Sequence, residues 1–443
     1  MRYFLDPFGC AKNQVDGENM MALLDKAGWS ACDDAGEADL IIVNSCAFIQ
    51  SAKQESINAV IAWKRRYREK KILLAGCLAE RYQRELAESL SEADGLLGSG
   101  EWDRVVPAAA ELTGGPAVSP PAAWGERPLT GFPGSAYIKI SEGCDNNCSF
   151  CAIPLIRGRL RSRRMDDIAE ECAALFGRGV KEFCFIGQDL ASYGKDFAAA
   201  APDESPSPLR LLLDKIAGLR GHFWARLLYL HPDHFPPDIL DLMEKDERFL
   251  PYFDIPFQHA APSVLAAMGR SGNAETYLAL LDTIRKRLPS AVIRSTFLVG
   301  FPGETGADFE HLLDFQQKAR FDWLGVFAYS REEGTAACGM KGRVNKKIAA
   351  ERKARVEEAQ GPVSEKQSER FMGRGLEVLV EEKIGAGYAE HSADIYLGRL
   401  YCHAPEVDGA AVIESALPRG IVPGGLYPCT VTGRAGIDLR VTL

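Results

Sequence analysis

Three cysteines on one short segment carry the clearest chemical signal in the sequence. Cys144, Cys148 and Cys151 have the spacing C-x3-C-x2-C, and no neighbouring Cys or His supplies the fourth ligand that a structural zinc site needs. Three thiolates on one loop can hold three irons of a 4Fe-4S cluster and leave the fourth iron open. That open iron can bind the amino and carboxylate groups of S-adenosylmethionine and pass an electron to its sulfonium. The spacing favours such a catalytic cluster over a zinc knot or three unrelated buried thiols.

Three further cysteines recur at intervals of about one strand-helix unit. Cys10, Cys46 and Cys77 each follow a predicted strand. Because the carboxyl ends of strands in an open parallel sheet meet at one crevice, we expect the three thiols to converge there. The alternative is that they are small apolar residues at the ends of buried strands. The other six cysteines show no such pattern, and we interpret them as packing residues.

The first third of the chain contains the elements that would position these three cysteines. Strands are expected at residues 2–8, 40–43 and 72–75, and helices at 14–27, 49–67 and 80–90. This alternation predicts a Rossmann-like parallel α/β domain. Residues 114–134 are rich in Pro and Gly, which is typical of a linker. We therefore expect an N-terminal cluster domain at 1–113, followed by a linker at 114–134.

The central part of the chain again alternates predicted strands and helices, and the last part has a different hydrophobic period. Six apolar strands are expected at 137–140, 183–186, 227–230, 253–257, 292–299 and 324–329. With their helices they predict a partial (β/α)6 barrel over residues 135–368, including a charged connecting helix that begins near residue 346 and a surface insertion at 197–208. From residue 376 the period becomes two, which predicts a small all-β barrel over 369–443. The overall fold class is α/β.

Candidate cofactor contacts lie at the carboxyl ends of the predicted barrel strands, where such folds place function. Gln188 could hydrogen-bond the amino group of the cofactor, and Gly300 and Gly303 would permit close approach of an adenine or ribose. These positions could equally serve turns. The guanidinium of Arg294 could meet a carboxylate of the cofactor or form an internal ion pair.

Charge and composition limit the classes of partner. The net charge of -9 would repel a phosphate backbone unless basic residues were gathered on one face. Five arginines between residues 157 and 164 form a local basic cluster, which could be a solvated loop or a binding site for an anion. No apolar run approaches the length of a membrane span, and the first residues lack the pattern of a secretory signal. We expect a cytoplasmic protein without a disulfide framework.

Over nearly its whole length the chain resembles the methylthiotransferases, which are radical S-adenosylmethionine enzymes with an N-terminal cluster domain, a central barrel and a C-terminal TRAM module. The resemblance is carried by the segments GCAKN (9–13), NSCAFI (44–49), AKQES (52–56), GFPGE (300–304) and VFAYS (326–330). It implies that Cys10, Cys46 and Cys77 bind a second 4Fe-4S cluster, which supplies or carries sulfur. One S-adenosylmethionine would then serve as methyl donor and another as the source of a radical.

Within that family, these segments resemble the branch that methylthiolates the β-carbon of an aspartate in small-subunit ribosomal protein number twelve. Sister branches modify adenosine in transfer RNA and remain the alternative. Residues 374–443 contain nine Asp or Glu and six Lys or Arg, and this negative module suits a basic protein better than a nucleic acid.

The resemblance further implies a reducing partner such as flavodoxin or ferredoxin, and we expect a monomer with no direct nucleic-acid substrate. A non-catalytic iron-sulfur protein that docks on ribosomes is the alternative from another class. That alternative leaves the six-strand barrel unexplained.

Overall fold

A five-stranded parallel sheet forms the core of the N-terminal domain, with the strand order β2-β1-β3-β4-β5. The computed structural model describes residues 1–118, 120–121, 124–197, 206–384, 394–415 and 420–443, so most of the expected insertion at 197–208 lies outside the described residues. The strands are β1 (Arg2–Pro7), β2 (Ser30–Ala31), β3 (Leu40–Ser45), β4 (Lys71–Gly76) and β5 (Gly95–Gly98). The helices are α1 (Ala11–Lys26), α2 (Gln50–Arg66), α3 (Cys77–Arg81), α4 (Gln83–Ser89) and α5 (Val105–Thr113).

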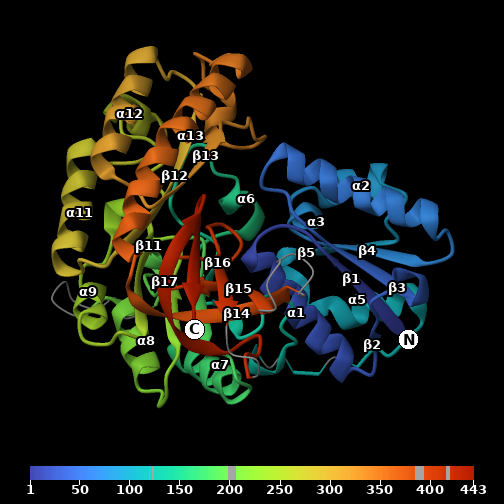
Figure 1. Cartoon of the computed structure of the whole chain (residues 1–443). Coiled ribbons are helices and arrows are strands. Elements are labelled where there is room, and N and C mark those ends of the chain that lie inside the picture. The colour runs from blue at the N-terminus through green and yellow to red at the C-terminus, as the bar shows by residue number, and fades with distance from the viewer. Residues whose placement is uncertain (119, 122–123, 198–205, 385–393, 416–419) are drawn as a thin grey trace.

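Strand β3 shows why this sheet is covered on both faces. Ile41 and Val43 pack in the cluster that contains residues of α2, whereas Leu40 and Ile42 pack in the cluster that contains residues of α1 and α5. Figure 1 shows α2 on one side of the sheet and α1 and α5 on the other. A strand that is apolar on both faces is typical of a parallel sheet between two helix layers, and the predicted α/β domain is confirmed.

The central domain is an open six-stranded parallel sheet with the order β13-β12-β11-β10-β9-β6. Its strands are β6 (Ser135–Lys139), β9 (Glu182–Ile186), β10 (Trp224–Leu227), β11 (Phe249–Asp254), β12 (Val292–Val299) and β13 (Trp323–Ala328), and a short antiparallel ribbon joins β7 (Ser141–Glu142) to β8 (Arg161–Ser162). The helices are α6 (Ile153–Arg157), α7 (Met165–Gly177), α8 (Pro208–Ala217), α9 (Ile239–Met243), α10 (Pro262–Ala267), α11 (Ala274–Arg287), α12 (Gly306–Ala319) and α13 (Lys346–Ser368). The sheet does not pair β6 with β13, so the predicted partial barrel is confirmed.

Two barrel strands begin and end earlier than the sequence predicts. The expected strands at 227–230 and 253–257 correspond to β10 and β11, which end at Leu227 and Asp254. The residues beyond these ends, among them Leu230 and Phe257, are completely buried although they are no longer in a strand. The apolar pattern therefore extends into loops at the carboxyl ends of the strands, and it shifts the predicted boundaries.

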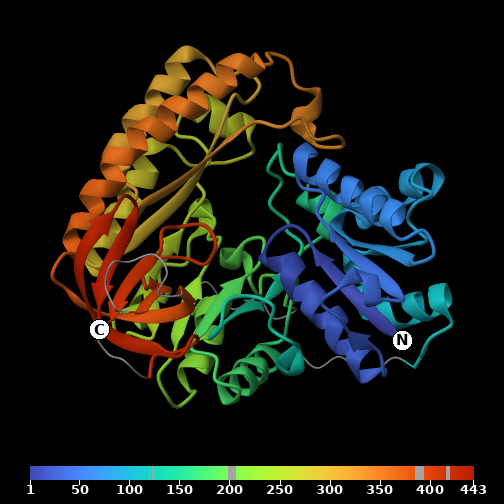
Figure 2. The same ribbon diagram turned by 45° about the vertical axis from the view of Figure 1, so that its right-hand side comes forward.

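The C-terminal module is a closed barrel with the strand order β14-β15-β16-β18-β17. Its strands are β14 (Gly375–Ile384), β15 (Asp394–Leu400), β16 (Ala411–Ser415), β17 (Leu426–Ala435) and β18 (Asp438–Thr442). The module shares a hydrophobic cluster with the central sheet, in which Trp224 and Tyr252 pack with Val378 and Leu400. This continuous core holds the all-β barrel against the central domain. Figure 2 shows the barrel beside the strands of that domain.

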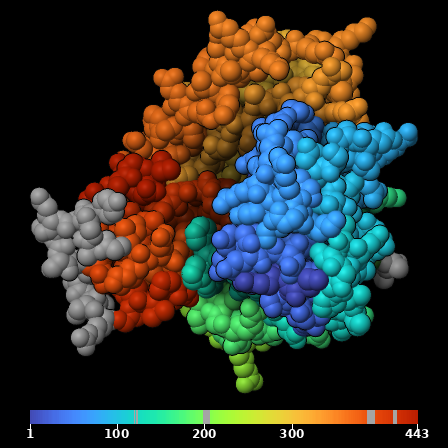
Figure 3. Space-filling model, turned by 90° about the vertical axis from the view of Figure 1, so that its right-hand side faces the viewer, coloured from blue at the N-terminus to red at the C-terminus, as the bar shows by residue number. Residues whose placement is uncertain are grey.

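The N-terminal domain is attached to the central domain by buried charges. Arg127 is completely buried between the two, and it donates to Glu18 of α1 at 2.9 Å and to Glu171 of α7. Figure 3 shows the N-terminal domain packed against the rest of the molecule. No helix in the described residues is long and apolar enough to cross a membrane.

Candidate functional site

The loop with Cys144, Cys148 and Cys151 lies between β7 and α6, after the first strand of the partial barrel. The backbone N–H of Ser149 donates to the carbonyl of Met268, and the N–H of Ala337 donates to the carbonyl of Ser149. These contacts tie the middle of the loop to two other segments of the domain. The three cysteines are partly exposed.

Gly143 is required for the path of the chain into this loop. Its φ of 72° lies in the left-handed region, and a Cβ at this position would lie 2.0 Å from the carbonyl oxygen of Arg159. No other residue fits such a contact without a shift of the backbone. The glycine lets the first cysteine approach the segment that leads into β8, and the N–H of Cys144 donates to the carbonyl of Gly158.

The second set of cysteines converges at the carboxyl end of the N-terminal sheet. Cys10 follows β1 at the start of α1, Cys46 follows β3, and Cys77 follows β4 as the first residue of α3. Since β1, β3 and β4 are neighbours in the sheet, their ends lie side by side. A Cβ on Gly9 would lie 3.1 Å from the Cβ of Cys46, which shows how closely the first two loops approach.

The thiols within each set affect one another's protonation. Burial raises the pKa of Cys77 to about 12, and the nearby Cys10 and Cys46 add to this rise. Burial likewise raises the pKa of Cys151 to about 12, with further contributions from Cys148 and Cys144. Within each set, the charge of one thiolate thus opposes ionisation of its neighbours.

Cys10 differs from the others because cations surround it. Burial alone would raise the pKa of its thiol, but the charges of Lys12 and then Arg157 hold the pKa below its usual value. Cys10 is exposed to solvent. An accessible thiol whose pKa is lowered by neighbouring cations is a good ligand for a metal.

The donor chemistry of both sets fits iron-sulfur clusters. All twelve cysteines are free. In the part of the chain that the structure describes, no three His, Cys, Asp or Glu side chains are grouped so as to hold a single metal ion. Each set instead offers three thiols, which is the ligation that leaves one iron of a 4Fe-4S cluster open.

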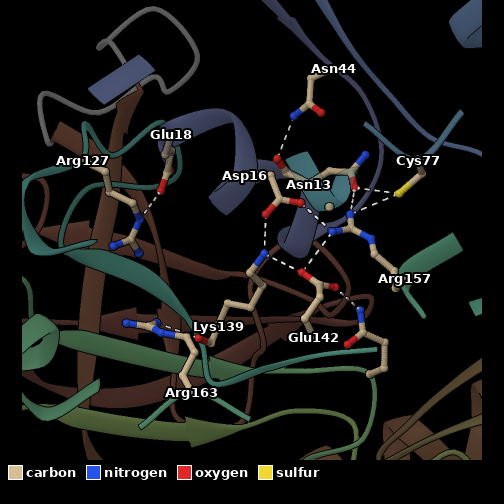
Figure 4. A network of polar contacts seen from close by, with 12 residues as sticks. Asn13, Asp16, Glu18, Asn44, Cys77, Arg127, Lys139, Glu142, Arg157 and Arg163 are labelled. Atoms are coloured by element: carbon tan, nitrogen blue, oxygen red, sulfur yellow. Dashed lines mark hydrogen bonds and ion pairs between the residues drawn. The ribbon is translucent and has the colours of Figure 1, made fainter. Parts of the chain in front are cut away.

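A buried polar network joins Cys77 of the N-terminal set to Glu142, which precedes the loop of the other set (Figure 4). Arg157, at the end of α6, donates through Nη2 to the Sγ of Cys77 at 3.1 Å and to the side-chain oxygen of Asn13. Its Nη1 donates to Asp16 at 2.6 Å and to Glu142 at 3.2 Å. The guanidinium thus connects the N-terminal cysteines to the segment that precedes Cys144.

Glu142 continues this network towards the barrel. Its carboxylate accepts from Lys139 at 2.7 Å and from the side-chain nitrogen of Gln188 at 3.0 Å. Burial opposes ionisation of Glu142, but the charges of Lys139 and Arg157 lower its pKa to about 2. The carboxylate is therefore ionised at neutral pH and orients three donors.

The residues predicted to contact the cofactor lie in different structural environments. Gln188 lies after β9, and its Oε1 is buried without a hydrogen-bond partner among the described residues. Gly300 has a φ of 74°, and a Cβ there would lie 2.5 Å from the Cβ of Ala349 in α13. Gly303 has a φ of 88°, and its N–H donates to the carbonyl of Gly342. Backbone conformation and packing therefore explain both glycines, with or without a cofactor nearby.

Arg294 forms an internal ion pair, which is one of the two roles that the sequence analysis considered for it. Its Nη1 lies 3.1 Å from Asp254, and its Nε lies 3.3 Å from Asp408 of the C-terminal module. Burial opposes its charge, but Asp254 leads the groups that raise its pKa well above the ordinary value. These carboxylates occupy the guanidinium, and its contact with a cofactor stays a prediction.

The basic cluster after the cysteine loop divides into two kinds of arginine. Arg157 is 5% exposed and belongs to the buried network, and Arg163 pairs with Glu171 at 2.7 Å. The side chains of Arg159 and Arg164 are 89% and 78% exposed. Neither a solvated loop nor an anion site describes the whole cluster, because it contains both buried and exposed arginines.

Sequence reasoning did not identify Asn13, Asp16, Lys139 and Glu142 as part of the site. The spacing of three residues between Asn13 and Asp16 places both on one face of α1, behind Cys10 at its start. This periodicity was the available signal on the N-terminal side. Lys139 and Glu142 show no comparable pattern, and only the folded chain brings them to α1.

Comparison with family models gives three consecutive matches. Residues 2–98 match "Uncharacterized protein family UPF0004", residues 138–315 match "Radical SAM superfamily", and residues 372–443 match "TRAM domain". These matches follow the three parts of the fold in order.

Curated relatives match along almost the whole chain. A protein of Treponema denticola named ribosomal protein uS12 methylthiotransferase RimO is 47% identical over 98% of this chain and 99% of the relative. A protein of the same name from Pelotomaculum thermopropionicum is 41% identical over 97% of this chain and 96% of the relative. Among solved structures, the radical S-adenosylmethionine methyltransferase TsrM of Kitasatospora setae is similar with a TM-score of 0.54 at 16% identity, covering 73% of this chain and 72% of that one. That structural similarity shows the fold alone.

Proposed function

Because the chain belongs to the RimO family of radical S-adenosylmethionine methylthiotransferases, we propose that it methylthiolates the β-carbon of an aspartate in small-subunit ribosomal protein uS12. The family resemblance inferred from the sequence is confirmed. The protein is a radical S-adenosylmethionine enzyme that uses 4Fe-4S clusters. The substrate proposal is supported by the name that these relatives carry.

One structural observation supports a two-cluster site most directly. Two sets of three free cysteines, from different domains, are linked by a single buried polar network, in which Arg157 contacts Cys77 and Glu142, two residues before Cys144. We assign the first cluster to Cys144, Cys148 and Cys151 and the second to Cys10, Cys46 and Cys77. With a cluster and S-adenosylmethionine bound, the first set would supply a radical that can remove hydrogen from an unactivated carbon. The cluster of the second set would carry the sulfur that is methylated and transferred.

The residues of the chain position these groups. Gln188 has a buried Oε1 that finds no partner in the described part of the chain and can accept a hydrogen bond from the cofactor's amino group, while its nitrogen is held by Glu142. A buried polar atom without a partner is costly, which supports a ligand at this position. Contacts from Gly300, Gly303 and Arg294 are part of the same proposal, although each of these residues also has a structural role.

The choice of a protein substrate also agrees with the charge of the C-terminal module. Its nine acidic and six basic residues give the module a negative net charge, which opposes binding to transfer RNA and favours a basic ribosomal protein. A transfer RNA adenosine methylthiotransferase is not favoured. We further propose a monomeric, cytoplasmic enzyme that receives electrons from a flavodoxin or ferredoxin. Its domain boundaries would be 1–113, 135–368 and 369–443, with the linker at 114–134.

The test is an anaerobic assay of the cluster-reconstituted protein with S-adenosylmethionine, sulfide and dithionite. Parallel reactions contain purified uS12 or unmodified transfer RNA, and mass spectrometry reads both products. We expect one CH2S unit to be added to uS12, at an aspartate, and none to the RNA. Addition to an adenosine of the RNA, with uS12 unchanged, would overturn the proposed substrate while leaving the radical chemistry in place.

A further inference from the structure

Arg157 touches both halves of the proposed two-cluster site. It ends helix α6, which begins two residues after Cys151, and its guanidinium reaches into the N-terminal domain, where Nη2 lies 3.1 Å from the Sγ of Cys77. We propose that Arg157 is a positioning residue that hydrogen-bonds the Cys77 ligand, raises the reduction potential of the N-terminal cluster, and fixes that ligand relative to the loop of the other cluster. The inference rests on the cluster ligation proposed above.

The surroundings of Arg157 hold its orientation. Nη1 is bound by Asp16 at 2.6 Å and by Glu142 at 3.2 Å, and only 5% of the residue is exposed. A guanidinium is planar and presents its five N–H donors in fixed directions. Because two carboxylates hold Nη1, the neighbouring Nη2 is aimed at Asn13 and at Cys77. A lysine has one donor centre and could not make both sets of contacts.

The location makes the hydrogen bond to sulfur effective. Cys77 is 8% exposed, so little water competes for its sulfur. Hydrogen bonds to ligand sulfurs and solvent exposure are among the factors that set the reduction potentials of iron-sulfur clusters. Reduction adds one negative charge, and a buried cationic donor stabilises the reduced form more than the oxidised form.

The size of the effect follows from the strength of such a contact. A hydrogen bond that involves a charged group is strong enough to change an equilibrium by about tenfold. For a one-electron couple, a tenfold change corresponds to about 59 mV. Loss of the guanidinium should therefore disfavour reduction of the N-terminal cluster by about this factor.

A purely structural role for Arg157 gives a different expectation. If the residue served only to neutralise Asp16 and Glu142, its removal would lower stability and leave the potential unchanged. The measurement must therefore report on the cluster itself.

The experiment is a redox titration of the N-terminal cluster by EPR in the full-length chain. Replacement of Cys144, Cys148 and Cys151 by Ala leaves a single cluster, and dithionite supplies one electron to it under anaerobic conditions. In this background, Arg157→Gln should shift the reduction equilibrium about tenfold towards the oxidised form, and Arg157→Lys should shift it less because the charge remains. Arg159→Gln is the matched control from the same loop, and its exposed side chain should leave the potential unchanged.

A second variant covers the case in which Arg157→Gln fails to fold. The double variant Asp16→Asn with Arg157→Gln removes both charges of the 2.6 Å pair, so no carboxylate of that pair is left buried alone. It also loses the hydrogen bond to the Sγ of Cys77, so its reduction equilibrium should shift towards the oxidised form, by less than in Arg157→Gln because the negative charge of Asp16 is removed as well. A reduction equilibrium within threefold of the parent in folded Arg157→Gln, or an unshifted equilibrium in the double variant where the single variant does not fold, would overturn the inference about Arg157. If the parent itself formed no cluster, the proposed ligation by the N-terminal cysteines would fall, and the inference with it.

Discussion

Glu182 holds the C-terminal module against the barrel, and its removal should weaken this contact strongly. The carboxylate lies on β9, is completely buried, and accepts from Arg226 of β10 at 2.8 Å and from Arg399 of β15 at 2.6 Å. Burial opposes its charge, but Arg399 and Arg226 together lower its pKa from 4.5 to about 2. Since each tenfold change in proton binding is about 1.4 kcal/mol, ionised Glu182 contributes about 3 kcal/mol at neutral pH.

The pH dependence of this contribution has a definite sign. A carboxyl group whose pKa is lower in the folded state stabilises the fold fully above its unfolded pKa of 4.5, and the contribution is lost as the pH falls towards 2. Glu182→Gln should therefore lower the free energy of unfolding by about 3 kcal/mol at pH 7 and by about 2 kcal/mol at pH 3.5.

The assay is urea unfolding of the cluster-free chain at both pH values, followed by circular dichroism and tryptophan fluorescence. Glu310→Gln is the control, because Glu310 pairs with Arg355 on the surface and should change stability by less than about 1 kcal/mol. If Glu182→Gln changed stability no more than this control, or by the same amount at both pH values, the argument from the buried pair would be refuted.

Three further substitutions test other parts of the structure. Cys148→Ala should abolish formation of 5'-deoxyadenosine, measured by chromatography, and retain the absorbance of the N-terminal cluster; continued cleavage would contradict the ligand assignment. Glu332→Gln leaves the buried Lys53, 2.9 Å away, without its counter-charge. It should lower the free energy of unfolding by about 3–5 kcal/mol and speed proteolysis between the first two domains. An unchanged thermal transition and digestion rate would argue against this role. Gly143→Ala places a Cβ 2.0 Å from the carbonyl of Arg159 and should halve the iron bound after reconstitution; full iron content would show that the loop tolerates the contact.

The parts of the fold that the sequence predicts are those with local signals. The apolar run from Leu40 to Val43 is buried on both faces, and the period of two after Gly375 marks the barrel of the C-terminal module. Strand β5 (Gly95–Gly98) escapes prediction because two of its four residues are Gly, and β2 has only two residues, both exposed. The helix expected at 80–90 is divided at Tyr82, whose φ of -130° is not helical.

For the candidate site, too, the sequence predicts only the residues that have a local signal. Cys10, Cys46 and Cys77 can be grouped from the sequence because each follows a strand of one parallel sheet. Arg157 cannot be told from Arg159, since both lie in the same basic run. Only the packing of α6 against α3, which begins with Cys77, turns the first towards that thiol and leaves the second in solvent.

The most direct test of the central claim uses a variant that separates the two sets of cysteines. In a full-length chain with Cys10, Cys46 and Cys77 replaced by Ala, reconstituted anaerobically and supplied with S-adenosylmethionine, sulfide, dithionite and uS12, we would measure 5'-deoxyadenosine and the mass of uS12 in the same sample. The two-cluster account predicts that deoxyadenosine is still formed while uS12 gains no CH2S unit. A CH2S gain equal to that of the unmodified enzyme would contradict the account, because sulfur would then reach the substrate without the N-terminal cysteines.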